Sequence, residues 1–163
     1  MIPLFIGLSI FNLLCLTIAT LLGYGVKFEG SALASYHQLS GVLATILCCA
    51  VHCIVFTYFI ATAKWIQHAI DVKHLDPALS APTRSFKAQA FPAALTAMAV
   101  VFLTAVVGVI TFSYGIRPIW HHMLALLCVA TNFGVCLIEY RAIVKNGRLV
   151  DSILLRINGP QTV

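Results

Sequence analysis

Four long apolar stretches, separated by shorter polar segments, dominate the pattern of hydrophobic and polar positions along the chain. They cover approximately residues 2–23, 39–63, 91–112 and 119–140. A membrane-spanning helix needs about 20 mostly apolar residues, so each stretch is long enough to cross a bilayer once. Helices are expected because a backbone in lipid must satisfy its own hydrogen bonds, and the alternation typical of barrel strands is absent. The pattern predicts an all-α integral membrane protein, a four-transmembrane-helix antiparallel bundle that forms one domain over residues 1–163.

The composition supports lipid as the solvent of this chain. Of the 163 residues, 61% are apolar and only 9% are charged, whereas soluble domains carry about 25% charged residues. The first stretch has no basic n-region and is longer than the apolar core of a signal peptide, about 7–15 residues, so we expect it to be retained as a span. All six cysteines lie within the apolar stretches, which favours buried free thiols over disulfides.

The positive charges predict which side of the membrane each segment faces. The connection 64–90 and the tail 141–163 hold eight of the ten Lys and Arg residues, and the other two connections hold only Lys27 and Arg117. Because basic residues stay on the cytoplasmic side, we expect both termini in the cytoplasm and a multi-pass location in a bacterial-type inner membrane. The net charge of +5 is explained by this bias. No basic cluster with interleaved aromatics indicates a nucleic-acid partner.

The two basic segments also contain amphipathic pieces. Residues 64–73 carry apolar positions at helical spacing, so the second span is expected to continue past the membrane until Asp76-Pro77. The tail has a comparable apolar face, formed by Leu149, Val150, Ile153, Leu154 and Ile157. Gly147 is expected to separate this tail from the fourth span, and Pro92 is expected in the first turn of the third span. Both amphipathic pieces are predicted to lie at the membrane interface, and for the tail docking on a neighbour is the alternative.

Polar residues inside the spans are costly in lipid and therefore point to packing contacts or function. One stripe of small and polar residues follows helical steps along the fourth span: His121, Ala125, Cys128, Asn132, Val135 and Glu139. From a rise of about 1.5 Å per residue, His52 and Asn132 lie at similar depth, and Asn12 also reaches the middle of the bilayer. We therefore expect His52 to bond Asn132 or Asn12 across helices. Glu139, near the cytoplasmic end, is expected to pair locally or with Lys64.

Three histidines at the outer level raise a cofactor hypothesis. His37 begins the second span, and His121 and His122 begin the fourth, so two imidazoles could face each other as a b-type haem requires. Arg117 could hold a haem propionate or a lipid phosphate by charge-assisted hydrogen bonds.

The spacing of His37 and His52 resembles that in the helices of two-haem cytochromes b. However, the counterpart of His52 on the fourth span falls near Val135 or Cys136, so a second haem is not expected. A weak repeat, YHQLSGVLA at 36–44 and WHHMLALLC at 120–128, accompanies the histidines.

Copper is a further alternative, because soft ligands cluster on the second span. Cys48, Cys49, His52 and Cys53 lie within about one and a half helical turns. They occupy two adjacent faces, so His52 could be a metal ligand only if other spans completed the site. A bound lipid or quinone also remains open.

The sequence carries no motif of a hydrolase, kinase, nucleotide-binding protein or zinc protease, so an independent enzyme is not expected. The architecture is similar to that of the small membrane-anchor subunits of respiratory complexes. We therefore predict a small non-catalytic polytopic subunit of a larger inner-membrane redox complex, with membrane lipids and other membrane subunits as partners. The alternative is a subunit that binds b-type haem and transfers electrons, in contact with quinone.

Overall fold

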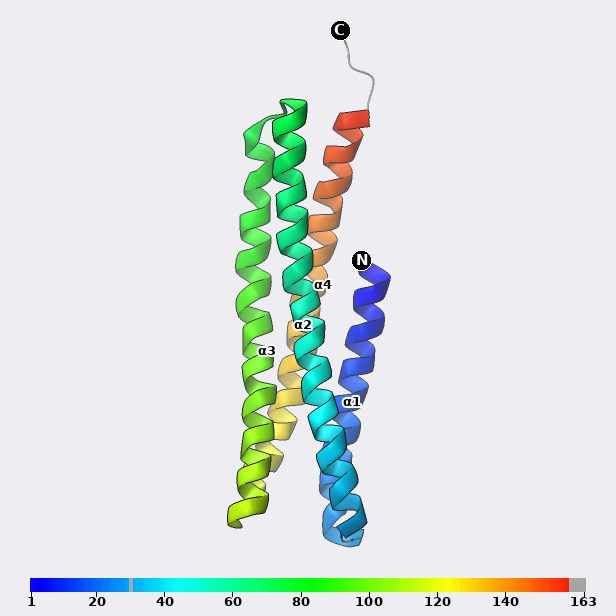
Figure 1. Cartoon of the computed structure of the whole chain (residues 1–163), viewed down its shortest axis with the longest axis vertical. Coiled ribbons are helices and arrows are strands. Elements are labelled where there is room, and N and C mark those ends of the chain that lie inside the picture. The colour runs from blue at the N-terminus through cyan, green and yellow to red at the C-terminus, as the bar shows by residue number, and fades with distance from the viewer. Residues whose placement is uncertain (30, 159–163) are drawn as a thin grey trace.

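Four long helices make up the structure of residues 1–29 and 31–158, the part of the chain that the computed structural model describes (Figure 1). They are α1 (Ile2–Glu29), α2 (Ser31–Lys73), α3 (Ala81–Tyr114) and α4 (Pro118–Asn158), and the short 3-10 helix η1 (Pro77–Ser80) joins α2 to α3. Each of the four is long and apolar enough to cross a membrane. Consecutive helices run antiparallel. The prediction of an all-α, multi-pass membrane protein is confirmed.

Three of the helices are much longer than a bilayer requires. α2 has 43 residues and α4 has 41, which corresponds to about 60 Å, against a hydrocarbon core of about 30 Å. α1 is shorter, with 28 residues. Figure 1 shows that α2, α3 and α4 continue past the N-terminus of α1 at the end of the bundle where the C-terminus lies. This three-helix extension contains the segments that were expected at the membrane interface.

The extension has a core of its own, which corrects the expected position of the tail. Gly147 does not interrupt α4. Ile66 and Ile70 of α2 are fully buried with Ile153 of α4, and partly buried residues surround them: Leu75, Leu79, Leu149, Val150 and Ile157. The two amphipathic faces therefore cover each other in part, while Trp65 and Leu154 remain exposed. Two apolar stripes on neighbouring parallel helices bury each other more completely than either would at an interface.

The position of Pro92 also differs from the prediction. α3 begins at Ala81, with Pro82 in its first turn, and Pro92 lies inside the helix. The residues between Pro82 and Pro92 are mostly polar but helical, so a prediction from apolar stretches alone does not include them in the helix. The predicted break at Asp76-Pro77 is confirmed, because α2 ends at Lys73 and the Asp76 carboxylate accepts the backbone N–H of Ala78 at 2.8 Å.

The bundle is built from two hairpins that repeat the same burial pattern. α1 packs mainly on α2, and α3 mainly on α4. An offset of 84 residues relates buried positions of α2 to buried positions of α4: Ala44 to Cys128, Cys48 to Asn132, Val51 to Val135, His52 to Cys136, Val55 to Glu139 and Phe59 to Ile143. An offset of 85 relates α1 to α3 in the same way: Phe5 to Ala90, Ser9 to Ala94, Asn12 to Ala97 and Leu16 to Val101.

Equivalent residues of the two hairpins touch each other directly. The Cys48 thiol donates to Asn132 Oδ1 at 3.1 Å, and Asn146 Nδ2 donates to the Thr62 hydroxyl at 2.9 Å, each pair being 84 residues apart. Contact between equivalent positions is what a two-fold axis produces. The two hairpins are thus related by a pseudo-two-fold axis that runs between α2 and α4 along the bundle. The weak repeat noticed in the sequence belongs to this symmetry.

Replacing Ile153 by Ala should lower the free energy of unfolding by about 2–5 kcal/mol, because the substitution leaves a cavity in the core of the extension. Denaturant unfolding of the detergent-solubilised protein measures this loss. Leu155→Ala is the matched control, since Leu155 lies on the same helix but is 74% exposed. Equal effects of the two substitutions would show that the tail does not pack on α2.

Candidate functional site

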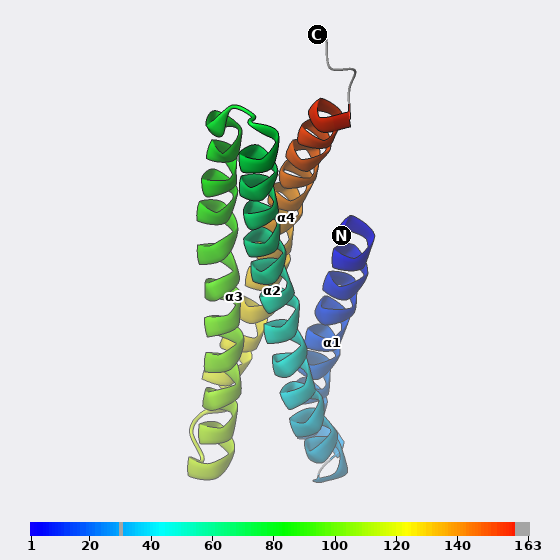
Figure 2. The ribbon, with the colours of Figure 1, turned by 45° about the horizontal axis from the view of Figure 1, so that its top comes forward.

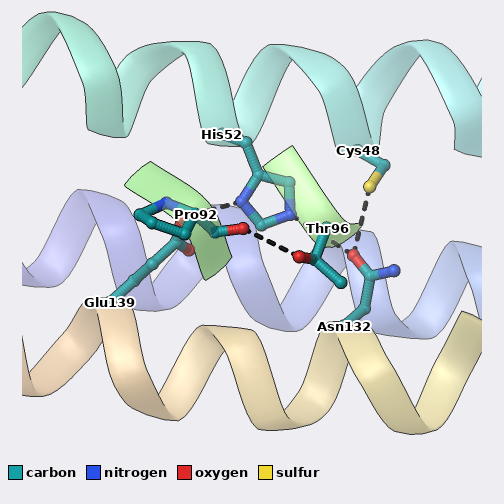
Figure 3. Close-up of polar contacts among 6 residues, drawn as sticks. All are labelled: Cys48, His52, Pro92, Thr96, Asn132 and Glu139. Atoms are coloured by element: carbon teal, nitrogen blue, oxygen red, sulfur yellow. Dashed lines mark hydrogen bonds and ion pairs between the residues drawn. The ribbon is translucent and has the colours of Figure 1, made fainter. Parts of the chain in front are cut away.

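A buried ion pair lies at the centre of the bundle (Figure 3). The Nδ1 atom of His52 on α2 is 2.8 Å from Oε1 of Glu139 on α4, and both side chains are completely inaccessible to solvent. On the other side of the imidazole ring, Nε2 is 3.4 Å from Oδ1 of Asn132. The ring therefore bridges two residues that lie two turns apart on the same face of α4.

Asn132 determines which protons the His52 ring carries. Its Nδ2 donates to the Cys128 carbonyl at 3.0 Å, and its Oδ1 accepts from the Cys48 thiol. Because Oδ1 can only accept a hydrogen bond, Nε2 of His52 must carry a proton. One further proton is then shared between Nδ1 of His52 and Oε1 of Glu139. With that proton the pair has no net charge, which is the form that burial in lipid favours.

The predicted contact of His52 with Asn132 is found, but the expected partner of Glu139 is wrong. Glu139 bonds His52, whereas Lys64 is exposed. The depth estimate compared backbone positions and neglected the length of the glutamate side chain, which reaches back toward the middle of the membrane. Both nitrogens of His52 are engaged, so neither is free for copper. Among the described residues, no three His, Cys, Asp or Glu side chains come together to hold a metal ion.

α1 adds two buried polar residues to the centre. Asn12 is fully buried beside Cys48, and Ser9 is 5% exposed beside Cys136. Within the described part of the chain, no partner accepts or donates a hydrogen bond at either polar atom of Asn12, at Ser9 Oγ or at Glu139 Oε2. Buried polar atoms of this kind are usual positions for ordered water. Ser9 was missed in the sequence, although it lies on the same helix face as Asn12.

Apolar layers enclose this centre on both sides. Toward the termini lies a cluster of buried residues from all four helices: Phe5, Val51, Val55, Phe59, Ala90, Ala142 and Ile143. Toward the opposite end lies a second cluster: Leu16, Ala44, Cys48, Val101 and Cys128. Among the described residues, His52, Asn132 and Glu139 join α2 to α4 between these two clusters. The packing role expected for them and for Asn12 stays a prediction.

A second group of histidines lies at the end of the bundle that carries the α1–α2 and α3–α4 connections. The rings of His37 on α2 and His121 on α4 face each other across the pseudo-two-fold axis, with centroids 5.8 Å apart and planes inclined by 69°. They are again 84 positions apart. His37 Nδ1 is 2.9 Å from the Ala19 carbonyl and donates to it, so in the neutral imidazole Nε2 is the nitrogen without a proton.

A glycine makes room for each of these rings. A Cβ atom on Gly23 would lie 2.8 Å from Cε1 of His37, and a Cβ atom on Gly108 would lie 2.9 Å from Cε1 of His121. The His121 ring also contacts the backbone of Thr104. Gly108 follows Thr104 by one turn, as Gly23 follows Ala19. The two histidines thus lie against equivalent glycines, but their hydrogen bonds differ: His37 Nδ1 bonds the Ala19 carbonyl, whereas His121 Nδ1 is buried without a hydrogen-bond partner among the described residues.

The core of the bundle does not extend to this histidine pair. Among the described side chains, none is buried on α1 after Ala19, on α2 before Ala44, on α3 after Val101 or on α4 before Cys128. Both views of the ribbon show the two hairpins diverging toward this end (Figures 1 and 2). His37 and His121 therefore meet beyond the part of the bundle in which the described side chains are buried.

The other two candidate residues lie beside the pair rather than within it. The ring of His122 stacks on Tyr24 of α1, with centroids 4.6 Å apart, and is 6.3 Å from the ring of His121. Arg117 is exposed in the turn between α3 and α4. The structure thus selects His121, rather than His122, as the partner of His37. The glycine seats were not predicted, because they depend on how neighbouring helices pack.

Removing both members of the central pair should cost less stability than the sum of the two single removals. His52→Leu and Glu139→Leu each leave a buried polar group unpaired, which costs about 1–3 kcal/mol. The double variant should therefore lose less than the sum of the single variants in an unfolding cycle. Cys53→Leu, on the exposed neighbour of His52, should change little. Strict additivity would show that the two residues do not interact.

Comparison with protein-family models, with curated proteins and with solved structures gives no match for this chain. Any function therefore has to be inferred from the geometry of the two sites. The central pair is closed to solvent, and both nitrogens of His52 are bonded to side chains of α4. The outer histidine pair is the arrangement that can bind a ligand.

Proposed function

We propose that this protein is a membrane electron-transfer subunit that binds one b-type haem between His37 and His121. The observation that carries the proposal is the symmetric pair of facing imidazoles, with ring centroids 5.8 Å apart. When two imidazoles bind the same metal ion from opposite sides, each through a nitrogen about 2 Å from the ion, their ring centres are about 6 Å apart. Among the described residues, no three His, Cys, Asp or Glu side chains come together as metal ligands. A pair of imidazoles would suit a porphyrin, which supplies four nitrogens of its own.

The hydrogen bond of His37 supports ligation. Histidines that bind a metal usually donate their other ring N–H to a carbonyl, carboxylate or water, which fixes the tautomer and the ring orientation. His37 donates from Nδ1 to the Ala19 carbonyl, so Nε2 is the atom that would hold iron. Gly23 and Gly108 allow both rings to stand close to the neighbouring helix.

The absence of buried side chains around the pair also agrees with a large flat cofactor. The described residues of the outer part of the bundle are at most partly buried, and a porphyrin would cover their apolar surface. Haem in such a site carries one electron at a time. Arg117, at the same end of the bundle, offers a cation for a propionate group.

The central site argues for one haem rather than two. The position equivalent to His52 is Cys136, and both nitrogens of His52 are already bonded. The second pair of ligands that a two-haem arrangement needs is therefore lacking at this level of the bundle.

The orientation that we propose places the haem near the outer face of a bacterial-type inner membrane, with both termini in the cytoplasm. The distribution of basic residues supports this orientation. The three-helix extension then projects into the cytoplasm. It favours a second candidate, a non-catalytic subunit that supports a larger membrane complex, because the extension offers other subunits a surface beyond the lipid.

A reduced-minus-oxidised spectrum of the purified protein separates the two candidates. We expect a sharp α-band in the wild type, and its loss in His37→Ala and His121→Ala, because each substitution removes one axial ligand. His68→Ala, on an exposed position of the extension, should keep the band. A featureless wild-type spectrum, after expression with sufficient haem, would contradict the haem proposal and favour the non-catalytic subunit.

A larger side chain at one glycine seat should also remove the haem without unfolding the protein. Gly23→Val should displace the His37 ring, since even a Cβ atom there would lie 2.8 Å from it. Gly7→Val is the matched control on the same helix, because nothing lies within 4 Å of a Cβ atom at Gly7. Haem content per protein and the thermal unfolding midpoint are measured for both. Full haem content in Gly23→Val would show that the ring position is irrelevant to binding.

A further inference from the structure

Basic side chains of three helices lie at one level of the bundle, where the three-helix extension begins. We call this group the basic collar, and it consists of Lys64 on α2, Lys87 on α3, and Lys145 and Arg148 on α4. Lys87 is half-buried, and the other three are exposed. Lys64 and Arg148 are 84 positions apart, so they are equivalent across the pseudo-two-fold axis.

Contacts between the helices fix the height of each collar residue. Asn146 of α4 bonds Thr62 of α2. The collar residues of these two helices are at most two positions from that contact, or about 3 Å along the axis. On α3, Phe91 packs on Phe56 of α2, and Lys87 lies about 6 Å beyond Phe91 in the direction of the extension. The four cations therefore lie in one layer about one helical turn thick.

The height of this layer matches the surface of a bilayer. His37 and His121 near the other end of the bundle are each 25 positions from Thr62 and Asn146, respectively, which corresponds to about 37 Å. The hydrocarbon core is about 30 Å thick and the whole bilayer about 40–45 Å, so both levels reach the headgroup region. Trp65 directly follows the collar residue of α2, and tryptophan is enriched at this depth.

The chain does not neutralise the collar. Within its described part, none of the four cations forms an ion pair with an acidic side chain. The Asp71 carboxylate accepts from Gln67 Nε2 at 3.2 Å, and the Asp76 carboxylate accepts from the backbone N–H of Ala78. The two basic segments together carry eight Lys and Arg residues but three Asp. An uncompensated positive layer thus remains at headgroup height.

We propose that the basic collar binds the phosphate groups of anionic phospholipids in the leaflet at this end of the bundle. Lys and Arg near a membrane surface attract anionic headgroups, and phosphate accepts charge-assisted hydrogen bonds from both. Cations on three helices at one height suit the lipids that surround a bundle, whereas an acidic protein segment would be expected to contact one side. The charge bias that orients the chain acts during insertion, and the collar adds a lipid preference to the folded protein.

Tryptophan fluorescence in vesicles tests this proposal, because brominated acyl chains quench a tryptophan that they contact. Trp120→Phe leaves Trp65 as the reporter beside the collar. The vesicles contain equal amounts of phosphatidylglycerol and phosphatidylcholine, and one or the other lipid is brominated. We expect phosphatidylglycerol to bind next to Trp65 about fivefold more strongly than phosphatidylcholine. The preference should decrease at high salt, because exposed charges are screened.

Two double variants in the Trp120→Phe background separate the collar from net charge. The collar variant carries Lys64→Gln and Arg148→Gln and should lose most of the preference. The matched control carries Lys73→Gln and Arg156→Gln, which remove the same charges from the same helices about 15 Å farther from the bilayer. The control should keep the preference. All four side chains are exposed, so both variants should keep the unfolding midpoint of the Trp120→Phe protein.

Equal binding of the two lipids beside Trp65 would overturn the proposal, and the cations would then serve only to orient the chain. An unchanged preference in the collar variant, or an equal loss in both double variants, would also overturn it. None of these measurements needs haem. Their outcome is therefore independent of the spectrum that tests the proposed function.

Discussion

The packing of α2 against α4 in a single register is the constraint on which the rest of this structure depends. Three polar contacts connect the two helices along their length: His52 with Glu139, Cys48 with Asn132, and Thr62 with Asn146. Lipid offers no partner to any of these groups, so a helix that slipped by one turn would leave several of them unpaired. Apolar layers alone could slide past one another at little cost, whereas these contacts fix the two helices at one relative height.

This register is what brings the outer histidines together. His37 and Cys48 lie on one helix, and His121 and Asn132 lie at the equivalent positions on the other. Once Cys48 meets Asn132, the pseudo-two-fold axis places the two imidazoles opposite each other three turns away. The symmetry is kept where a planar, nearly symmetric ligand would bind. It is broken at the centre, where His52 corresponds to Cys136.

Much of the fold could be predicted because hydrophobic length and charge bias act locally in sequence. The four helices, the continuation of α2 and the contact of His52 with Asn132 follow from periodicity and depth. The pairing of Glu139 with His52 could not be predicted from backbone depth, because a long side chain reaches about one turn from its own position. The docking of Ile153 on Ile66 was missed for a different reason: an amphipathic face does not show what covers it. The seats of His37 and His121 on Gly23 and Gly108 depend on helix packing within each hairpin, which one sequence does not reveal.

The central claim is that the outer ends of the two hairpins, joined in register by α2 and α4, form a cradle for a porphyrin. An experimental density map of the protein purified from its native membrane tests this most directly. Planar density between Nε2 of His37 and the ring of His121, continuous with both side chains, is the expected result. A map with no planar density at the two imidazoles, and with lipid or the chain's own side chains around them, would contradict the account.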